Sequence, residues 1–108
     1  MKKYKWNENG VCLNPESPIN TINGRRGFSI EVAQAPDGTY RAGHHIVFPA
    51  GGMAIHGTNI KGDVYRSDKE AIRSELKKVI ARRDCPKEVA KAARGFLMEY
   101  IFEQQKLF

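Results

Sequence analysis

The stretch of sequence that decides the fold covers residues 28–48 and reads FSIEVAQAPDGTYRAGHHIVF. Apolar and ring-bearing residues stand at alternate positions in both of its halves: Phe28, Ile30 and Val32, then Tyr40, Ala42, His44, Ile46 and Phe48. Such alternation is typical of strands with one buried face. The Pro-Asp-Gly sequence at residues 36–38 supplies the residue types that a tight turn requires. The stretch therefore predicts an antiparallel hairpin at the centre of the fold.

Two further segments extend this predicted sheet. Residues 4–13 place an Asn-Gly pair between two short runs with alternating apolar positions, which indicates an N-terminal hairpin. Residues 14–27 are rich in Pro, Gly, Asn and Ser, so we expect a surface connection there rather than a strand. A Gly-Gly pair at residues 51–52 can turn the chain back into a short strand around residues 53–56. The sheet is therefore expected to have three to four strands.

Two helices are predicted to follow the sheet. Ser67 and Glu70 have the Ser-x-x-Glu spacing in which a hydroxyl and a carboxylate each satisfy a free backbone amide at a helix start. Apolar stripes at helical spacing then predict one helix over residues 68–83 and a second over residues 86–103. Strands followed by helices indicate a single α+β domain, a small antiparallel sheet packed by two C-terminal helices. Its expected parts are an N-terminal hairpin and loop (residues 1–27), a central sheet (28–57), two helices (67–103) and a free tail (104–108).

The positive charge of the chain is concentrated in two segments. Eighteen Lys and Arg residues against twelve Asp and Glu residues give a net charge of +6. Residues 1–27 contribute +3 and residues 66–94 contribute +5, whereas the other segments are slightly acidic. A basic surface of this kind is typical of proteins that meet phosphates or an acidic partner.

The cysteines and the N-terminus indicate the compartment. Cys12 and Cys85 have no local Cys partner, and no apolar run is long enough for a signal peptide or a membrane span. We therefore expect a cytoplasmic protein with reduced thiols and no membrane contact.

Six basic residues are the candidates for binding nucleic acid: Arg25, Arg26, Arg73, Lys77, Arg82 and Arg83. Arg73 and Lys77 are four residues apart and so share one face of the predicted helix. Cations on one face can follow a phosphate backbone and bind it without reading its sequence. The alternative is a solvated face that is neutralised locally by Glu70, Glu75 and Glu88.

The chain ends in Gln104-Gln105-Lys106-Leu107-Phe108. This pentapeptide resembles the peptide with which many bacterial replication, repair and mobile-element proteins bind the DNA polymerase sliding clamp, commonly Gln-Leu-(Ser or Asp)-Leu-Phe. The resemblance implies that Gln104 contacts the rim of the clamp pocket, and that Leu107 and Phe108 fill its hydrophobic cleft. Gln105 and Lys106 depart from the pattern. The alternative is that Leu107 and Phe108 continue the apolar stripe of the preceding helix.

The order of the predicted elements carries a second resemblance. A three-stranded sheet, followed by a helix that opens with Ser-Asp-Lys-Glu-Ala at residues 67–71, resembles the second half of a double-stranded-RNA-binding domain. The resemblance implies recognition of duplex shape through basic residues at the start of that helix. The leading helix of the family is missing here, and an extra terminal helix is present.

His44, His45 and His56 are the candidates for catalysis or metal binding. Neighbouring residues of a strand point to opposite faces, so His44 and His45 are not expected to hold one metal ion. The Cys and His residues also lack the closely spaced pairs that structural zinc sites require. We therefore predict no metal, no cofactor and no catalytic residue. The alternative is a cleft that contains His44, His56 and Asp63.

Together these patterns favour a small non-enzymatic accessory protein, of phage or mobile-element origin, that binds macromolecules. Its expected partners are a protein, such as the sliding clamp, and nucleic acid. The alternatives are a sequence-independent nucleic-acid-binding module that acts through the basic helices, and an enzyme that uses His44 and His56. The apolar stripe near the C-terminus is compatible with a monomer or a homodimer.

Overall fold

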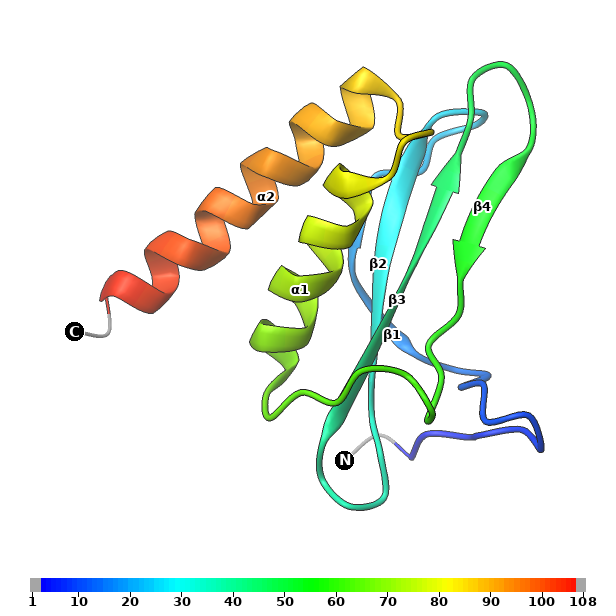
Figure 1. The fold of residues 1–108 in the computed structure, drawn as a ribbon, viewed down its shortest axis with the longest axis vertical. Coiled ribbons are helices and arrows are strands. Elements are labelled where there is room, and N and C mark those ends of the chain that lie inside the picture. Colours follow the sequence, from blue (N-terminus) through cyan, green and yellow to red (C-terminus); the bar gives the residue numbers. More distant parts are fainter. Residues whose placement is uncertain (1–2, 107–108) are drawn as a thin grey trace.

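The described residues form a four-stranded antiparallel sheet with two helices on one of its faces (Figure 1). The computed structural model describes the backbone of residues 3–106 and the side chains of residues 3–101. The strands are β1 (Glu16–Asn20), β2 (Gly27–Gln34), β3 (Tyr40–Val47) and β4 (Met53–His56), in that order across the sheet. The helices are α1 (Asp68–Ala81) and α2 (Lys87–Lys106). The predicted α+β class, with the helices C-terminal to the sheet, is confirmed.

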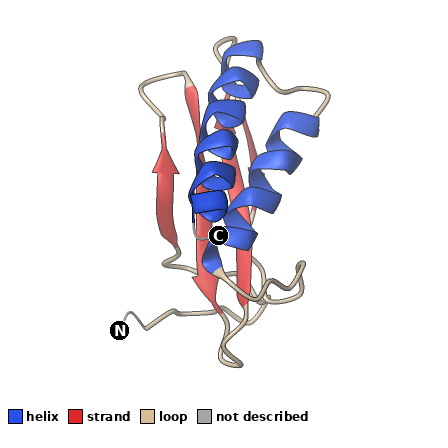
Figure 2. Cartoon of the chain, turned by 90° about the vertical axis from the view of Figure 1, so that its left-hand side faces the viewer, coloured by secondary structure: helices blue, strands red, loops and turns tan. Residues whose placement is uncertain are grey.

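The β2–β3 hairpin has the register that the alternation predicts. Phe28 lies opposite Ile46 and Ile30 lies opposite His44, so the buried side chains of both strands share the face that the helices cover. Figure 2 shows the two helices stacked over this face. Gly38 closes the turn with a φ of 89°, a left-handed conformation that glycine adopts without steric strain.

The segment that we predicted as a surface connection contains strand β1. Residues 16–20 pair with β2, and Ile19 lies opposite Ile30 in the core. Proline is excluded from central strands because it has no N–H to donate, but β1 is at the edge of the sheet, where that N–H is not needed. The register shifts between Glu16 and Ile19, the stretch that contains Pro18. The prediction was wrong because composition alone does not distinguish an edge strand from a loop.

The predicted N-terminal hairpin is a chain reversal held by single bridges rather than by a ladder. Trp6 pairs with Cys12, and the backbone N–H of Gly10 donates to the carbonyl oxygen of Asn7 at 2.9 Å. Val11 pairs with Asn59 from the loop after β4. The N-terminal segment is therefore attached to that loop.

Helix α1 begins where the sequence predicts and ends two residues early. The Ser67 hydroxyl accepts a hydrogen bond from the backbone N–H of Glu70 at 3.1 Å, which caps the first turn. Arg82 is extended, with a ψ of 135°, and therefore ends the helix. Helix α2 packs against α1, and its first buried residues are Val89, Ala90 and Ala93.

A single apolar layer between the sheet and the helices holds the fold together. Its fully buried side chains include Phe28, Ile30, Ile46, Leu76 and Val79. Helix α2 adds an edge-to-face contact between the rings of Phe96 and Phe28, whose centroids are 6.2 Å apart. Neither helix of the described chain has an apolar stretch of the length that a bilayer crossing requires.

Gly43 and Gly95 offer a matched test of this packing. A Cβ atom at Gly43 would collide with the carbonyl oxygen of His56 and lie 2.8 Å from the backbone nitrogen of Thr58. A Cβ atom at Gly95 in α2 would meet nothing within 4 Å. We expect Gly43→Ala to lower the free energy of unfolding by about 1–3 kcal/mol because the backbone after β4 must shift.

Gly95→Ala is the control, and we expect it to raise the free energy of unfolding by up to about 1 kcal/mol, since Ala favours the helix. Urea unfolding measures both effects. A Gly43→Ala variant as stable as the wild type would contradict the close approach of the two chain segments.

Candidate functional site

A buried polar cluster joins α1 to strands β3 and β4. It consists of His44, His56 and Glu75, and we call it the His-Glu-His cluster. The register places His44 on β3 opposite His56 on β4, and Glu75 reaches both of them from α1. The Oε2 atom of Glu75 lies 2.6 Å from Nδ1 of His44 and 3.0 Å from Nδ1 of His56. One carboxylate oxygen therefore connects the helix to two strands.

The apolar stripe of α1 explains why a carboxylate lies in the interior. Ile72, Leu76 and Val79 turn one face of the helix to the sheet, and Glu75 stands three residues after Ile72 on that same face. The Glu75 side chain has no exposed surface, and that of His44 is 4% exposed. The His56 side chain is 52% exposed, because β4 is at the sheet edge. The cluster thus has one buried side and one side open to solvent.

The charge of Glu75 is maintained by its hydrogen bonds. Burial by itself raises the pKa of this carboxyl, but the hydrogen bonds with His44 and His56 outweigh burial and hold the pKa below its ordinary value of 4.5. An ionised carboxylate can only accept hydrogen bonds, so the Nδ1 atoms of both histidines are the donors.

The second oxygen of Glu75 is less well satisfied. Oε1 is buried and accepts no hydrogen bond from the described residues. The nearest cation, the Lys78 ammonium group, lies 3.8 Å from it and makes its close contact, at 2.7 Å, with Asp63. Asp63, which the sequence analysis grouped with the histidines, therefore binds Lys78 instead.

Arg82, which we predicted to bind nucleic acid, is engaged within the protein. Its Nε and Nη2 atoms donate to the two carboxylate oxygens of Asp84 at 2.8 and 2.9 Å. Its Nη1 atom lies 3.4 Å from Nε2 of His44. Two of its three nitrogens thus serve one carboxylate, which leaves Arg82 largely neutralised.

The other candidate cations are not engaged in this way. Arg25, Arg26, Lys77 and Arg83 are exposed, and Arg73 is half-buried. The β1–β2 turn, which carries Arg25 and Arg26, lies at the same end of the molecule as the α1–α2 loop, which carries Arg83 (Figures 1 and 2). The structure therefore brings four of the six residues to one end, the paired Arg82 among them, and leaves Arg73 and Lys77 on the outer side of α1.

The alternative of local neutralisation does not hold for Glu75. Glu75 points into the core, because the apolar stripe on either side of it faces the sheet. Its hydrogen-bond partners are histidines from β3 and β4, and among the candidate cations Arg73 and Lys77 neither pairs with it in the described structure.

The proposed clamp-binding residues lie outside the part of the chain whose side chains are described. Gln104 belongs to α2, but its side chain is not described, and Leu107 and Phe108 follow the last described residue. Their role in binding a protein partner stays a prediction.

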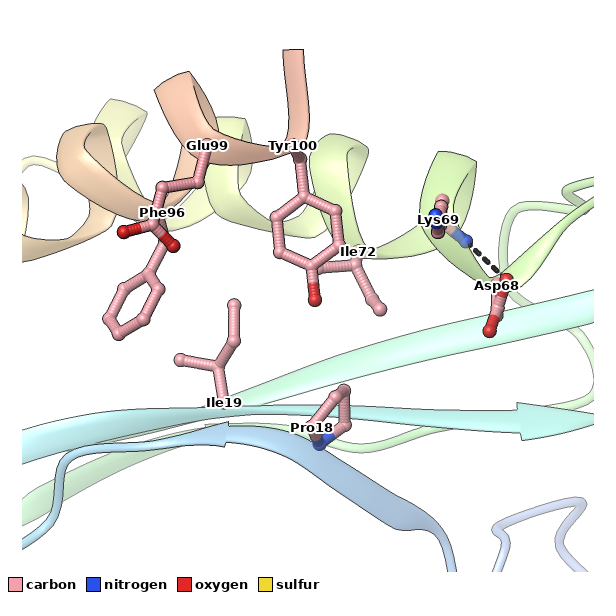
Figure 3. Close-up of a pocket in the computed structure, with 8 residues that line it drawn as sticks. All are labelled: Pro18, Ile19, Asp68, Lys69, Ile72, Phe96, Glu99 and Tyr100. Atoms are coloured by element: carbon pink, nitrogen blue, oxygen red, sulfur yellow. Dashed lines mark hydrogen bonds between the residues drawn. The ribbon is translucent and has the colours of Figure 1, made fainter. Parts of the chain in front are cut away.

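One cavity of the described structure is separate from the histidines. It measures about 430 Å³ and lies between β1, α1 and α2 (Figure 3). Ile19, Ile72 and Phe96 form its apolar walls, and Asp68 and Lys69 stand at one end. Since β1 and β4 are opposite edges of the sheet, this cavity is remote from the exposed face of His56.

Comparison of the chain with protein-family models, with curated proteins and with solved structures finds no match. The chemistry of the described residues therefore carries the functional argument alone.

Sequence reasoning missed Glu75 as a site residue and did not connect it with the two histidines. The signal that could have found it is an acidic residue inside the apolar stripe of α1, since a buried carboxylate needs partners.

A double-variant experiment tests whether the cluster is an energetically coupled unit. His44→Leu removes a partner and leaves the Glu75 carboxylate buried, so we expect it to lower the free energy of unfolding by about 3–5 kcal/mol. In the variant His44→Leu/Glu75→Leu the buried charge is absent, and we expect part of that stability to return. Chemical denaturation compares the variants; a double variant less stable than His44→Leu would contradict the coupling.

Proposed function

We propose that the protein binds nucleic acid through contacts between phosphate groups and the outer side of α1. The observation that carries the proposal is the absence of carboxylate partners for Arg73 and Lys77 among the described residues. Lys77 has no acidic residue three or four positions away in α1. Glu70 is the acidic neighbour of Arg73 at this spacing, and it accepts a hydrogen bond from the backbone N–H of Arg66 at 3.2 Å. Two cations one helical turn apart are thus available to successive phosphates.

Three further cations extend this basic surface. Arg25 and Arg26 in the β1–β2 turn and Arg83 in the α1–α2 loop are exposed, and none of them forms an ion pair within the described part of the chain. Both segments lie at the end of the molecule toward which α1 runs (Figure 1). Phosphates that contact these side chains release bound counterions, which favours binding without regard to sequence.

The shape of this surface favours a polymer over a small phosphate ester. Small ligands are held in concave, mostly apolar pockets. The cavity of about 430 Å³ shown in Figure 3 is lined neither by Arg73 and Lys77 nor by the arginines of the two connecting segments. An extended polyanion can instead contact separated side chains on an open surface, and so we infer a nucleic-acid strand or duplex as the ligand.

The experiment is a salt titration of binding to fluorescently labelled 20-mer RNA and DNA, single-stranded and duplex, followed by fluorescence anisotropy. We expect the logarithm of the binding constant to fall linearly with the logarithm of salt concentration. The variant Arg73→Gln/Lys77→Gln is expected to bind more weakly. For duplex DNA, the slope is expected to become shallower by about 0.9 for each phosphate that the variant no longer neutralises.

The matched control is Lys3→Gln/Lys5→Gln, which removes the same charge from the exposed N-terminal segment. It is expected to keep a slope close to that of the wild type. A binding constant that does not change with salt, or an equal loss of affinity in both variants, would refute a phosphate-binding surface on α1.

A further inference from the structure

The His-Glu-His cluster contains the donor set of a transition-metal site. Among the described residues, the ligating atoms of His44, His56 and Glu75 all lie within 4.8 Å of one another. Imidazole nitrogen together with carboxylate oxygen suits Zn²⁺ and its neighbours in the transition series, whereas Mg²⁺ and Ca²⁺ prefer all-oxygen sets. The prediction of no metal rested on the opposite faces of His44 and His45 and on the wide spacing of the Cys and His residues, whereas the register pairs His44 with His56.

The spacing of the three ligating atoms fits a single ion. Zinc binds histidine nitrogen and carboxylate oxygen at about 2.0–2.2 Å, so ligand atoms around one tetrahedral ion lie about 3.3 Å apart. The two measured separations from Glu75 Oε2 are 2.6 and 3.0 Å. A metal ion in place of the two hydrogen-bonded protons therefore requires the His44 nitrogen to move about 0.7 Å and the His56 nitrogen about 0.3 Å away from Glu75 Oε2.

A second observation points to a ligand at this position. The Oε1 atom of Glu75 is buried and accepts no hydrogen bond from the described residues, although buried carboxylate oxygens are nearly always paired. The ammonium group of Lys78, at 3.8 Å, is too distant to donate a hydrogen bond to it. The carboxylate whose Oε2 atom meets both imidazoles thus has a second buried oxygen that a bound cation can satisfy.

We propose that His44, His56 and Glu75 bind one divalent transition-metal ion of the Zn²⁺ class. The ligands are Nδ1 of each histidine and the carboxylate of Glu75, two neutral donors and one negative charge. The half-exposed side chain of His56 provides the entry path from solvent. With three protein ligands, a fourth tetrahedral position is left for water, which is the arrangement of open zinc sites.

The surroundings of His44 set a limit on the affinity. A neutral histidine that binds a metal through Nδ1 carries its proton on Nε2, and Nη1 of Arg82 faces that nitrogen at 3.4 Å. Metal binding therefore disrupts this interaction, and Arg82 keeps its two bonds with Asp84. We expect a Kd in the range of about 1 µM rather than the far tighter binding of closed structural zinc sites.

The test is calorimetric titration of ZnCl₂ into the full chain, freed of any affinity tag and previously dialysed against a chelator. We expect one ion per chain. The primary variant is His56→Ala, because His56 is half-exposed and His44 still donates to the Glu75 carboxylate in its absence. Removing a residue that only hydrogen-bonds a metal ligand weakens metal binding by up to about 100-fold. Loss of one of the three ligands themselves is therefore expected to weaken Zn²⁺ binding by more than about 100-fold.

Two matched controls separate this site from other metal-binding groups. His45→Ala removes a histidine that is adjacent in sequence but points to the other face of the sheet, and Cys85→Ser removes a half-buried thiol near Arg82. Both variants are expected to bind Zn²⁺ within threefold, roughly, of the wild type, since neither supplies a ligand. The proposal is overturned if the wild type takes up no Zn²⁺ at about 100 µM, if His56→Ala binds as the wild type does, or if either control loses as much affinity as His56→Ala.

Discussion

The carboxylate of Glu75 imposes the constraint on which the arrangement of helix and sheet depends. A charge with no exposed surface costs several kcal/mol unless hydrogen bonds compensate it, and histidines from β3 and β4 supply those bonds. Because both Nδ1 atoms meet the same oxygen, α1 can neither slide nor rotate on the sheet without stranding the charge. The apolar layer of Phe28, Ile46 and Leu76 supplies most of the favourable free energy, but it is less selective about register.

The inward position of Glu75 also decides the charge of the outer surface. There are five carboxylates between residues 66 and 94. Glu75 accepts hydrogen bonds in the core, and Asp84 pairs with Arg82. Glu70 serves the start of α1 through the backbone N–H of Arg66. The cations on the outer side of α1 therefore give this surface a positive electrostatic potential, which an approaching ligand meets. One helix thus combines a polar inner contact with a basic outer face.

Local patterns predicted the features that depend on neighbours in sequence. The β2–β3 hairpin needs only alternating side chains and a turn residue with a left-handed φ, and the start of α1 needs only the Ser67 hydroxyl and the N–H of Glu70. Strand β1 escaped prediction because its proline, Pro18, is tolerated only at a sheet edge, and the position of a strand within a sheet is not a local property. The cluster escaped for a similar reason, since Glu75 follows His44 by 31 residues.

The sequence by itself determined the fold class, the central hairpin, the starts of both helices to within a residue and the presence of a basic segment. These features depend on periodicity, capping and charge, which are properties of short stretches of chain. Only the tertiary structure decided which cations stay unneutralised and which histidine faces which. The alternation along residues 40–48 assigns His44 and His45 to opposite faces of the strand but does not show which residues His44 meets. The register of β3 against β4 then sends His44 toward His56 and Glu75, and His45 to the opposite face. The register between two strands is determined by which face of the sheet is buried, and this depends on residues far apart in the sequence. The three side chains of the cluster therefore meet only in the folded chain.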